Sequence, residues 1–177
     1  MVGIAIMAVL MAIAVPSFQS TIASSRLTTT TNDLVSALSA ARSEAIRRGL
    51  RVTACKSTNG TQCTTAGNWS QGWIVYTDPT RTGTNATVDT GEVILVTGAA
   101  STTGTILAGT TGMDNFVSYA ANGQPKLMNG TSQSGRIRVC SSSGALSNAA
   151  RARDVEISTT GRLFTSTPAN VAATCPL

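Results

Sequence analysis

The sequence predicts an α+β fold in which one long N-terminal helix packs on antiparallel β-sheet. Two observations carry this prediction: a helical pattern runs without interruption over residues 1–48, and short β-rich segments separated by turns fill the remainder. The length of 177 residues suits one domain plus this helix. Only 12 % of the residues are charged, and Thr, Ser, Gly and Ala abound, as is typical of a β-rich domain outside the cytosol.

The predicted helix has two different halves. Met1–Val15 contains no charged residue, whereas the chain from Ser17 onward is amphipathic. Its apolar face is formed at helical spacing by Leu27, Leu34, Leu38, Ala41 and Ala45. Gly49 is a suitable helix end. At about 1.5 Å per residue, the helix would be about 70 Å long. A compact domain of this size cannot cover that length, so one end must lie in a membrane or among other subunits.

The apolar end has two alternative interpretations. It spans only about 22 Å, against about 30 Å of bilayer hydrocarbon, and a secretory signal peptide has this length. However, no basic segment precedes it and no Ala-x-Ala site follows it. A buried core helix would be expected to show some polar face. We therefore favour a membrane or assembly helix whose first turns are missing from the sequence. Its predicted residues are Met1, Val2, Ile4, Ile6, Val9, Leu10, Ile13, Val15 and Pro16.

Pro16 and the region after Gly49 carry further local signals. Pro16 would remove one helical hydrogen bond and loosen the preceding turn. After Gly49, strands are expected at Arg51–Cys55, within Asn68–Asp78, and at Glu92–Val96, Ile106–Leu107, Phe116–Tyr119, Arg136–Cys140, Asp154–Ser158 and from Leu163. Asn122-Gly123 and Thr160-Gly161 are turn signals. Trp69 and Trp73 suit packing against a strand face, and stacking on a ligand is the alternative.

The four cysteines divide into two plausible disulfides. Cys55 and Cys63 flank a turn-rich loop, and Cys140 and Cys175 would pin the C-terminal tail. An even number of cysteines behind an export-type N-terminus favours disulfides. A zinc site is the alternative, but the sequence has neither Cys-x-x-Cys spacing nor histidine.

The residues offer little for catalysis. The absence of histidine removes Ser-His and Cys-His pairs and the commonest general base. The eight acidic residues are scattered, and Gly109–Gly112 lacks the lysine of a phosphate-binding loop. We therefore expect no enzymatic activity, no cofactor and no metal.

Two stretches reveal a family resemblance. Met1–Phe18 resembles the N-terminal helix of type IV pilins and type II secretion pseudopilins. In that family a prepilin peptidase cuts before a Phe-Thr-Leu-Ile-Glu-Leu segment and methylates the new N-terminus. Met1 aligns with about the seventh residue after that cut, so we expect the leader and first mature residues to be absent. Trp69–Asp78 and Arg42–Ala45 resemble the GspH/FimT-type branch of minor pilins.

The resemblance implies a type IV pilin-like fold and a structural role. The expected function is that of a minor pilin in the priming or tip complex of a type IV pilus, and the alternative is a minor pseudopilin of a type II secretion system. Residues 1–23 would form the transmembrane and assembly half of the helix. Residues 24–177 would form the globular domain, with the amphipathic helix half at 24–49 and the β-rich region at 50–177. Expected partners are other pilin subunits and, for the precursor, the prepilin peptidase. The chain would reside in the bacterial inner membrane, with its domain periplasmic, before joining the pilus or pseudopilus.

DNA binding is a further hypothesis. Residues 126–177 hold six basic and two acidic groups. Some FimT-like pilins bind DNA through a late Gly-Arg-x-Arg motif, which Gly161–Phe164 matches only at its first arginine. A literal copy, Gly135–Arg138, occurs earlier. The candidate contacts are Arg136, Arg138, Arg151, Arg153 and Arg162, because arginine grips phosphate oxygens with two donors. Surface charge that only confers solubility is the alternative.

Overall fold

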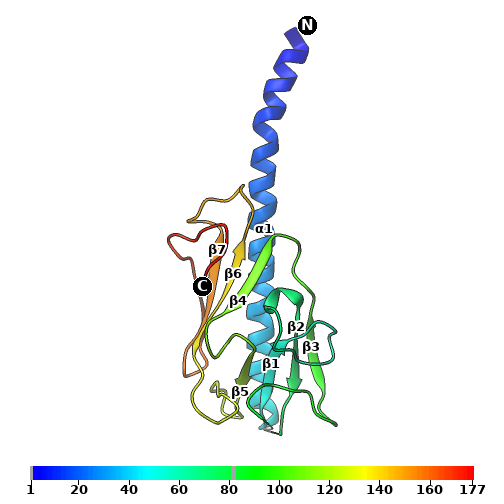
Figure 1. Cartoon of the computed structure of the whole chain (residues 1–177), viewed down its shortest axis with the longest axis vertical. Helices are drawn as coiled ribbons and strands as arrows, with labels where there is room; N and C mark the ends of the chain where they lie inside the picture. The colour runs from blue at the N-terminus through cyan, green and yellow to red at the C-terminus, as the bar shows by residue number, and fades with distance from the viewer. Residues whose placement is uncertain (1, 81–82) are drawn as a thin grey trace.

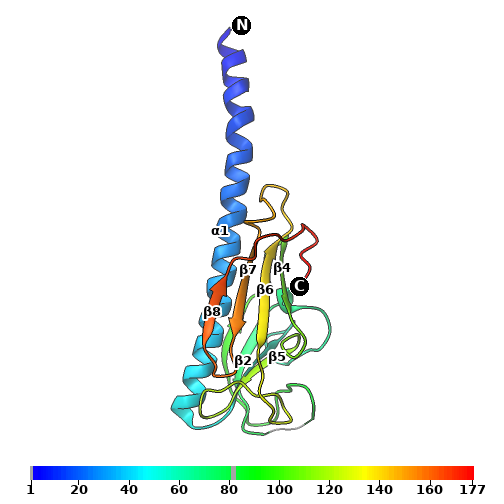
Figure 2. The same cartoon turned by 90° about the vertical axis from the view of Figure 1, so that its left-hand side faces the viewer.

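The computed structural model describes residues 2–80 and 83–177, and of residues 2 and 4–16 only the backbone. It confirms the α+β architecture. A single helix, α1 (Val2–Arg48), extends over 47 residues without a break at Pro16. The C-terminal half of α1 lies along the β-sheets, and its N-terminal half projects beyond them, as two perpendicular views show (Figures 1 and 2).

Eight strands form two antiparallel four-stranded sheets, where the sequence alone had predicted antiparallel strands without dividing them. The first sheet has the order β3-β2-β1-β5 and the second the order β4-β6-β7-β8. The strands of the first sheet are β1 (Val52–Lys56), β2 (Trp73–Thr77), β3 (Ile94–Gly98) and β5 (Phe116–Tyr119). Those of the second are β4 (Thr105–Gly109), β6 (Gly135–Ser141), β7 (Ala152–Ile157) and β8 (Leu163–Ser166).

The core lies between α1 and the two sheets. The predicted apolar face of the helix is confirmed, since its members are at most 1 % exposed: Leu27, Leu34, Leu38, Ala41 and Ala45. They pack in one cluster with residues of both sheets, including Val75 of β2 and Val139 of β6. One helix face therefore holds both sheets together.

Both tryptophans are buried, as predicted for core residues. Trp73 begins β2, whereas Trp69 lies in a 3₁₀ helix, η1 (Trp69–Gln71), and not in a strand. The Asn68 side chain accepts a hydrogen bond from the backbone N–H of Ser70, which fixes the start of η1. The Trp69 indole N–H donates to the carbonyl of Met113 at 2.9 Å.

Candidate functional site: the assembly helix and the arginine-bearing sheet

The predicted membrane and assembly segment falls largely outside the described side chains. Met1 is not described, and the structure gives only the helical backbone at Val2, Ile4, Ile6, Val9, Leu10, Ile13, Val15 and Pro16. Within the described part of the chain, no helix is both long enough and apolar enough to cross a membrane. Side-chain burial in the described part of α1 begins at Ala23.

A hydroxyl-rich stretch connects the apolar half of α1 to the domain. The side chains of Thr21, Thr28 and Thr31 each donate to the backbone carbonyl four residues earlier. These bonds satisfy the hydroxyls within the helix itself. Phe18 and Ile22 lie on the same stretch and are 69 % and 50 % exposed. The helix thus carries exposed apolar side chains where it leaves the sheets.

Arg42 ties the C-terminal end of α1 to two distant turns. Its Nε donates to the carbonyl of Gly123, and its Nη2 to the carbonyl of Thr160, each at 3.1 Å. Gly161 has φ of 80°, and a side chain there would collide with the Gly123 carbonyl. These contacts give a physical role to both predicted turns and to the arginine of the Arg42–Ala45 motif.

Arg138 does not present its charge to solvent. It is 8 % exposed, and its Nε and Nη2 donate to the two carboxylate oxygens of Asp154 on β7, each at 2.7 Å. Hydrogen bonding to Asp154 raises the pKa of Arg138. Its Nη1 donates to the carbonyl of Pro176 in the C-terminal tail. Arg138 therefore joins β6, β7 and the tail.

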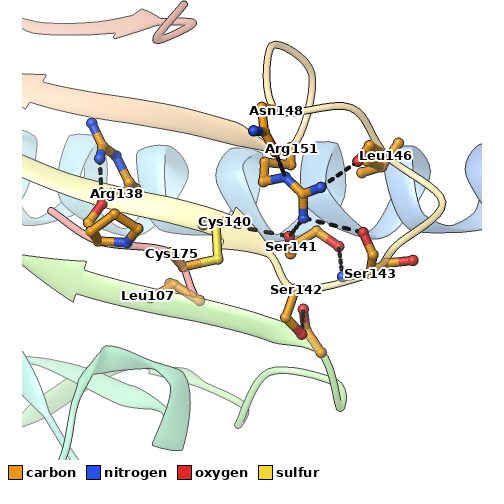
Figure 3. Close-up of a disulfide and its surroundings, with 12 residues drawn as sticks. Leu107, Arg138, Cys140, Ser141, Ser142, Ser143, Leu146, Asn148, Arg151 and Cys175 are labelled. Atoms are coloured by element: carbon orange, nitrogen blue, oxygen red, sulfur yellow. Dashed lines mark hydrogen bonds between the residues drawn. A yellow bond between two sulfur atoms is a disulfide. The ribbon is translucent and has the colours of Figure 1, made fainter. Parts of the chain in front are cut away.

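Arg151 is also buried, and its guanidinium forms hydrogen bonds within the protein. It is 5 % exposed and donates to the backbone carbonyls of Ser141, Ser143 and Leu146 at 3.2, 3.2 and 2.5 Å. Its Nε donates to the Asn148 side chain. Figure 3 shows this guanidinium enclosed by the loop between β6 and β7. Arg151 organises that loop.

The remaining arginines do not complete a single patch. Arg153 pairs with Val139 in the register of β6 and β7, so it lies on the core-facing side of the sheet, opposite to Arg136 and Arg138. Arg136 is 40 % exposed and lies 3.5 Å from Asp154, and Arg162 is exposed in the turn before β8. The five-arginine surface expected from sequence is thus corrected: burial removes Arg138 and Arg151, and strand alternation separates Arg153.

The cysteines are joined as the two expected pairs, Cys55–Cys63 and Cys140–Cys175. The second bond, drawn in Figure 3, brings the tail onto the outer face of the second sheet. There Val171 is buried in one cluster with Cys140 and Ala152. The first closes the loop from Cys55 to Cys63, and the Lys56 ammonium holds the segment that follows this loop by donating to the carbonyls of Thr65 and Gly67. Burial lowers the pKa of Lys56.

A buried polar cluster lies on β1 and was not anticipated from sequence. The Thr53 hydroxyl lies 2.6 Å from a carboxylate oxygen of Asp78 and 2.7 Å from the Ser118 hydroxyl. Arg51 lies 3.9 Å from Asp78. Burial raises the pKa of Asp78 to about 6, against the opposing influence of Thr53 and Arg51. Because these residues come from three segments that are far apart in the sequence, no local sequence pattern could have identified the cluster.

Among the described residues, no three His, Cys, Asp or Glu side chains are grouped so that they could hold a metal ion. The features that the structure does supply are mechanical. A helix extends beyond the domain, and within the domain buried arginines and disulfides fix the loops and the C-terminal tail. This combination defines a structural subunit built around a protruding helix.

Comparison with known proteins shows which family the chain belongs to. Residues 30–161 match the family of type II transport protein GspH, and the chain belongs to this family of minor pilins and pseudopilins. Two crystal structures of the type IV minor pilin FimU from Pseudomonas aeruginosa PAO1 are similar, each at 15 % identity. The first has a TM-score of 0.52 and covers 87 % of this chain and 96 % of FimU. The second has a TM-score of 0.47 and covers 85 % and 98 %. No curated protein matches the sequence.

The family and the first structural match confirm the resemblance and the type IV pilin fold predicted from sequence. Proteins of this family are structural subunits of pili or pseudopili and are not known as enzymes.

Proposed function

We propose that this chain is a minor pilin of a type IV pilus that acts in the priming or tip complex. The observation that carries the proposal is the two-part helix: α1 is anchored on both sheets by its amphipathic half, and its uncharged half projects beyond them (Figure 1). Such a segment would lie in the inner membrane before assembly. It would then pack among the helices of neighbouring subunits, which exchanges lipid contacts for helix contacts.

The test is processing and membrane retention of a complete precursor. The chain is fused behind a prepilin leader and the Phe-Thr-Leu-Ile-Glu-Leu segment of the family, and is expressed with a prepilin peptidase. We expect cleavage, recovery in the inner membrane and incorporation into pili. Val9→Arg should abolish recovery in the membrane, because a charge is costly in hydrocarbon, whereas Thr61→Arg on the exposed Cys55–Cys63 loop should not. A precursor that is neither processed nor retained contradicts the proposal.

A minor pseudopilin of a type II secretion system is the second candidate, favoured by the description of the matching family as a type II transport protein. The two functions predict different defects. Deletion of a minor pilin reduces surface pili and leaves protein secretion intact. Deletion of a pseudopilin blocks secretion of folded proteins and leaves surface pili in place.

A further inference from the structure

A pocket lies beside α1 where the helix leaves the domain towards its apolar half. It encloses about 260 Å³. The outer wall is formed by residues 103–105 at the start of β4 and residues 141–143 at the end of β6, and the wall on α1 by Gln19, Ile22, Ala23 and Arg26. We call this space the α1–β4 pocket. Figures 1 and 2 show that the turn before β4 and the loop after β6 lie at the end of the domain that faces the N-terminal half of α1.

The two segments that form the outer wall are tied to each other and to a buried arginine. The backbone N–H and the hydroxyl of Ser142 both donate to the carbonyl of Gly104, at 2.8 and 3.3 Å. Arg151 donates to the carbonyls of Ser141 and Ser143. The wall is therefore held in place by contacts within the domain, and a ligand would not need to order it.

The lining of the pocket is rich in hydroxyl groups and carries a single charge. Among the described residues that line it, five are serine or threonine and only Arg26 is charged. Arg26 is exposed and has no ion pair or hydrogen bond with another described residue. The first acidic residue of α1, Asp33, lies seven positions later, about 10 Å along the helix. Because guanidinium and hydroxyl groups bind phosphate oxygens well, this lining favours a phosphate group.

The position of Arg26 on α1 indicates where that phosphate would come from. Phe18, Ile22 and Arg26 follow at steps of four residues and therefore share one helix face. Phe18 and Ile22 are 69 % and 50 % exposed. Arg26 comes three residues after the predicted transmembrane half, residues 1–23, which is about 4.5 Å along the helix. The headgroup layer on each side of the hydrocarbon is about 5–7 Å thick, so Arg26 falls at the level of the lipid phosphates.

We infer that the α1–β4 pocket binds the headgroup of an anionic phospholipid while the subunit resides in the inner membrane. This inference rests on the proposed function, since it needs α1 inserted in a bilayer. The Arg26 guanidinium would pair with the lipid phosphate, and Ile22, which lines the same pocket, would contact the acyl chains next to it. A zwitterionic lipid balances its phosphate with its own ammonium group, so the pocket favours an anionic lipid.

The experiment uses the processed full-length chain, with the N-terminal segment of the family restored, in phosphatidylcholine vesicles with and without phosphatidylglycerol. A photo-crosslinking amino acid replaces Thr103, which lines the pocket, or Thr111, an exposed threonine beyond the opposite end of β4. Mass spectrometry identifies the lipid adducts. We expect position 103 to capture phosphatidylglycerol several-fold more often, per lipid present, than phosphatidylcholine, and position 111 to capture neither.

Two arginine variants separate this pocket from a general effect of charge. Arg26→Gln should lower the phosphatidylglycerol adduct about five-fold, as expected for one arginine near an anionic surface. Arg47→Gln, which removes an exposed arginine at the other end of α1, should leave the adduct unchanged. Excess inorganic phosphate should not displace the lipid, because a lipid in the same membrane has the higher effective concentration.

Three results would each overturn the inference. They are equal capture of both lipids per lipid present, an adduct that Arg26→Gln leaves unchanged, and loss of the adduct in inorganic phosphate, which would indicate a site for a small soluble anion. Co-flotation of the protein with the vesicles is measured on the same samples. A chain that co-floats without selective capture rejects only the lipid site, whereas a chain that does not co-float rejects the proposed function as well.

Discussion

Arg138 and Asp154 form a two-pronged ion pair across β6 and β7, and the C-terminal tail completes it through the carbonyl of Pro176. The pair is buried, so breaking it leaves one charge without compensation. We expect Arg138→Ala to lower the free energy of unfolding by about 3–5 kcal/mol. Replacing both residues, as in Arg138→Met with Asp154→Leu, should cost much less.

Urea unfolding with both disulfides intact measures this effect. Glu44→Gln is the control, because Glu44 pairs with Arg47 and Arg48 on the open surface of α1 and should contribute little. An Arg138→Ala variant as stable as the Glu44→Gln variant would show that the buried pair does not hold the tail.

The burial of Arg138 and Arg151 also sets the expected DNA behaviour. Arg136 and Arg162 remain accessible, and both lie at the end of the second sheet where β6 begins and β8 starts. Two phosphate contacts would give a slope of about −2 in a plot of log affinity against log salt, whereas five would give a slope of about −4.5.

Fluorescence anisotropy with duplex DNA over a salt series tests this expectation. Arg136→Ala with Arg162→Ala should remove the salt-dependent binding, and Arg153→Ala should not. The Arg138→Ala variant is unsuitable here, since it would combine lost contacts with lost stability. A slope near that for five contacts would contradict the arrangement described above.

The hydroxyl of Tyr119 is buried and has no hydrogen-bond partner among the described residues. Burial also raises the pKa of this phenol. Tyr119→Phe removes the unpaired group without altering the ring, so we expect stability to rise by about 1 kcal/mol. Tyr76→Phe is a matched control, because the Tyr76 hydroxyl donates to the Thr87 carbonyl at 2.9 Å. That variant should lose about 1 kcal/mol. Equal effects of the two changes on the urea midpoint would contradict the conclusion that only the Tyr76 hydroxyl has a hydrogen-bond partner.

Interactions between residues close together in the sequence could be predicted from it, whereas those between distant residues could not. Helical spacing identified the buried face of α1, and the segment Phe116–Tyr119 was predicted with the bounds that β5 has. Alternation in Arg136–Cys140 correctly placed Arg136 and Arg138 on one strand face. Alternation does not reveal whether that face is covered. The cover comes from the tail, which a disulfide returns to the sheet from 35 residues away.

Asp78 makes stability depend on pH in a definite direction. Its pKa is raised from 3.8 to about 6 in the folded protein, mainly by burial. The folded state therefore binds this proton more tightly than the unfolded state does. The contribution of Asp78 favours folding most below pH 3.8, and it is lost as the pH rises through 6.

The measurement compares unfolding free energies of the native chain and Asp78→Asn at pH 4.5 and pH 7.5. The unfolding free energy of the native chain, taken relative to that of the variant, should be larger at pH 4.5 than at pH 7.5. Thr53, Arg51, Glu92 and Asp89 all influence this carboxyl group and remain in both proteins, so the difference isolates Asp78. A difference that is constant with pH would mean that the carboxyl group titrates normally.

The two disulfides should differ in their contribution to stability. Cys140–Cys175 closes a separation of 35 residues, and Cys55–Cys63 one of 8. Loop-closure entropy predicts that replacing the first pair with serine costs about 4 kcal/mol and the second about 2.5 kcal/mol. The structure adds to the contrast. Without the Cys55–Cys63 bond, Lys56 still holds the segment directly after Cys63 through the carbonyls of Thr65 and Gly67. Without the Cys140–Cys175 bond, the tail loses its covalent link to β6. Urea unfolding of the two double-serine variants gives the order. Limited proteolysis should cut the tail only in the Cys140/Cys175 variant, and an intact tail there would mean that Arg138 and Val171 suffice to hold it.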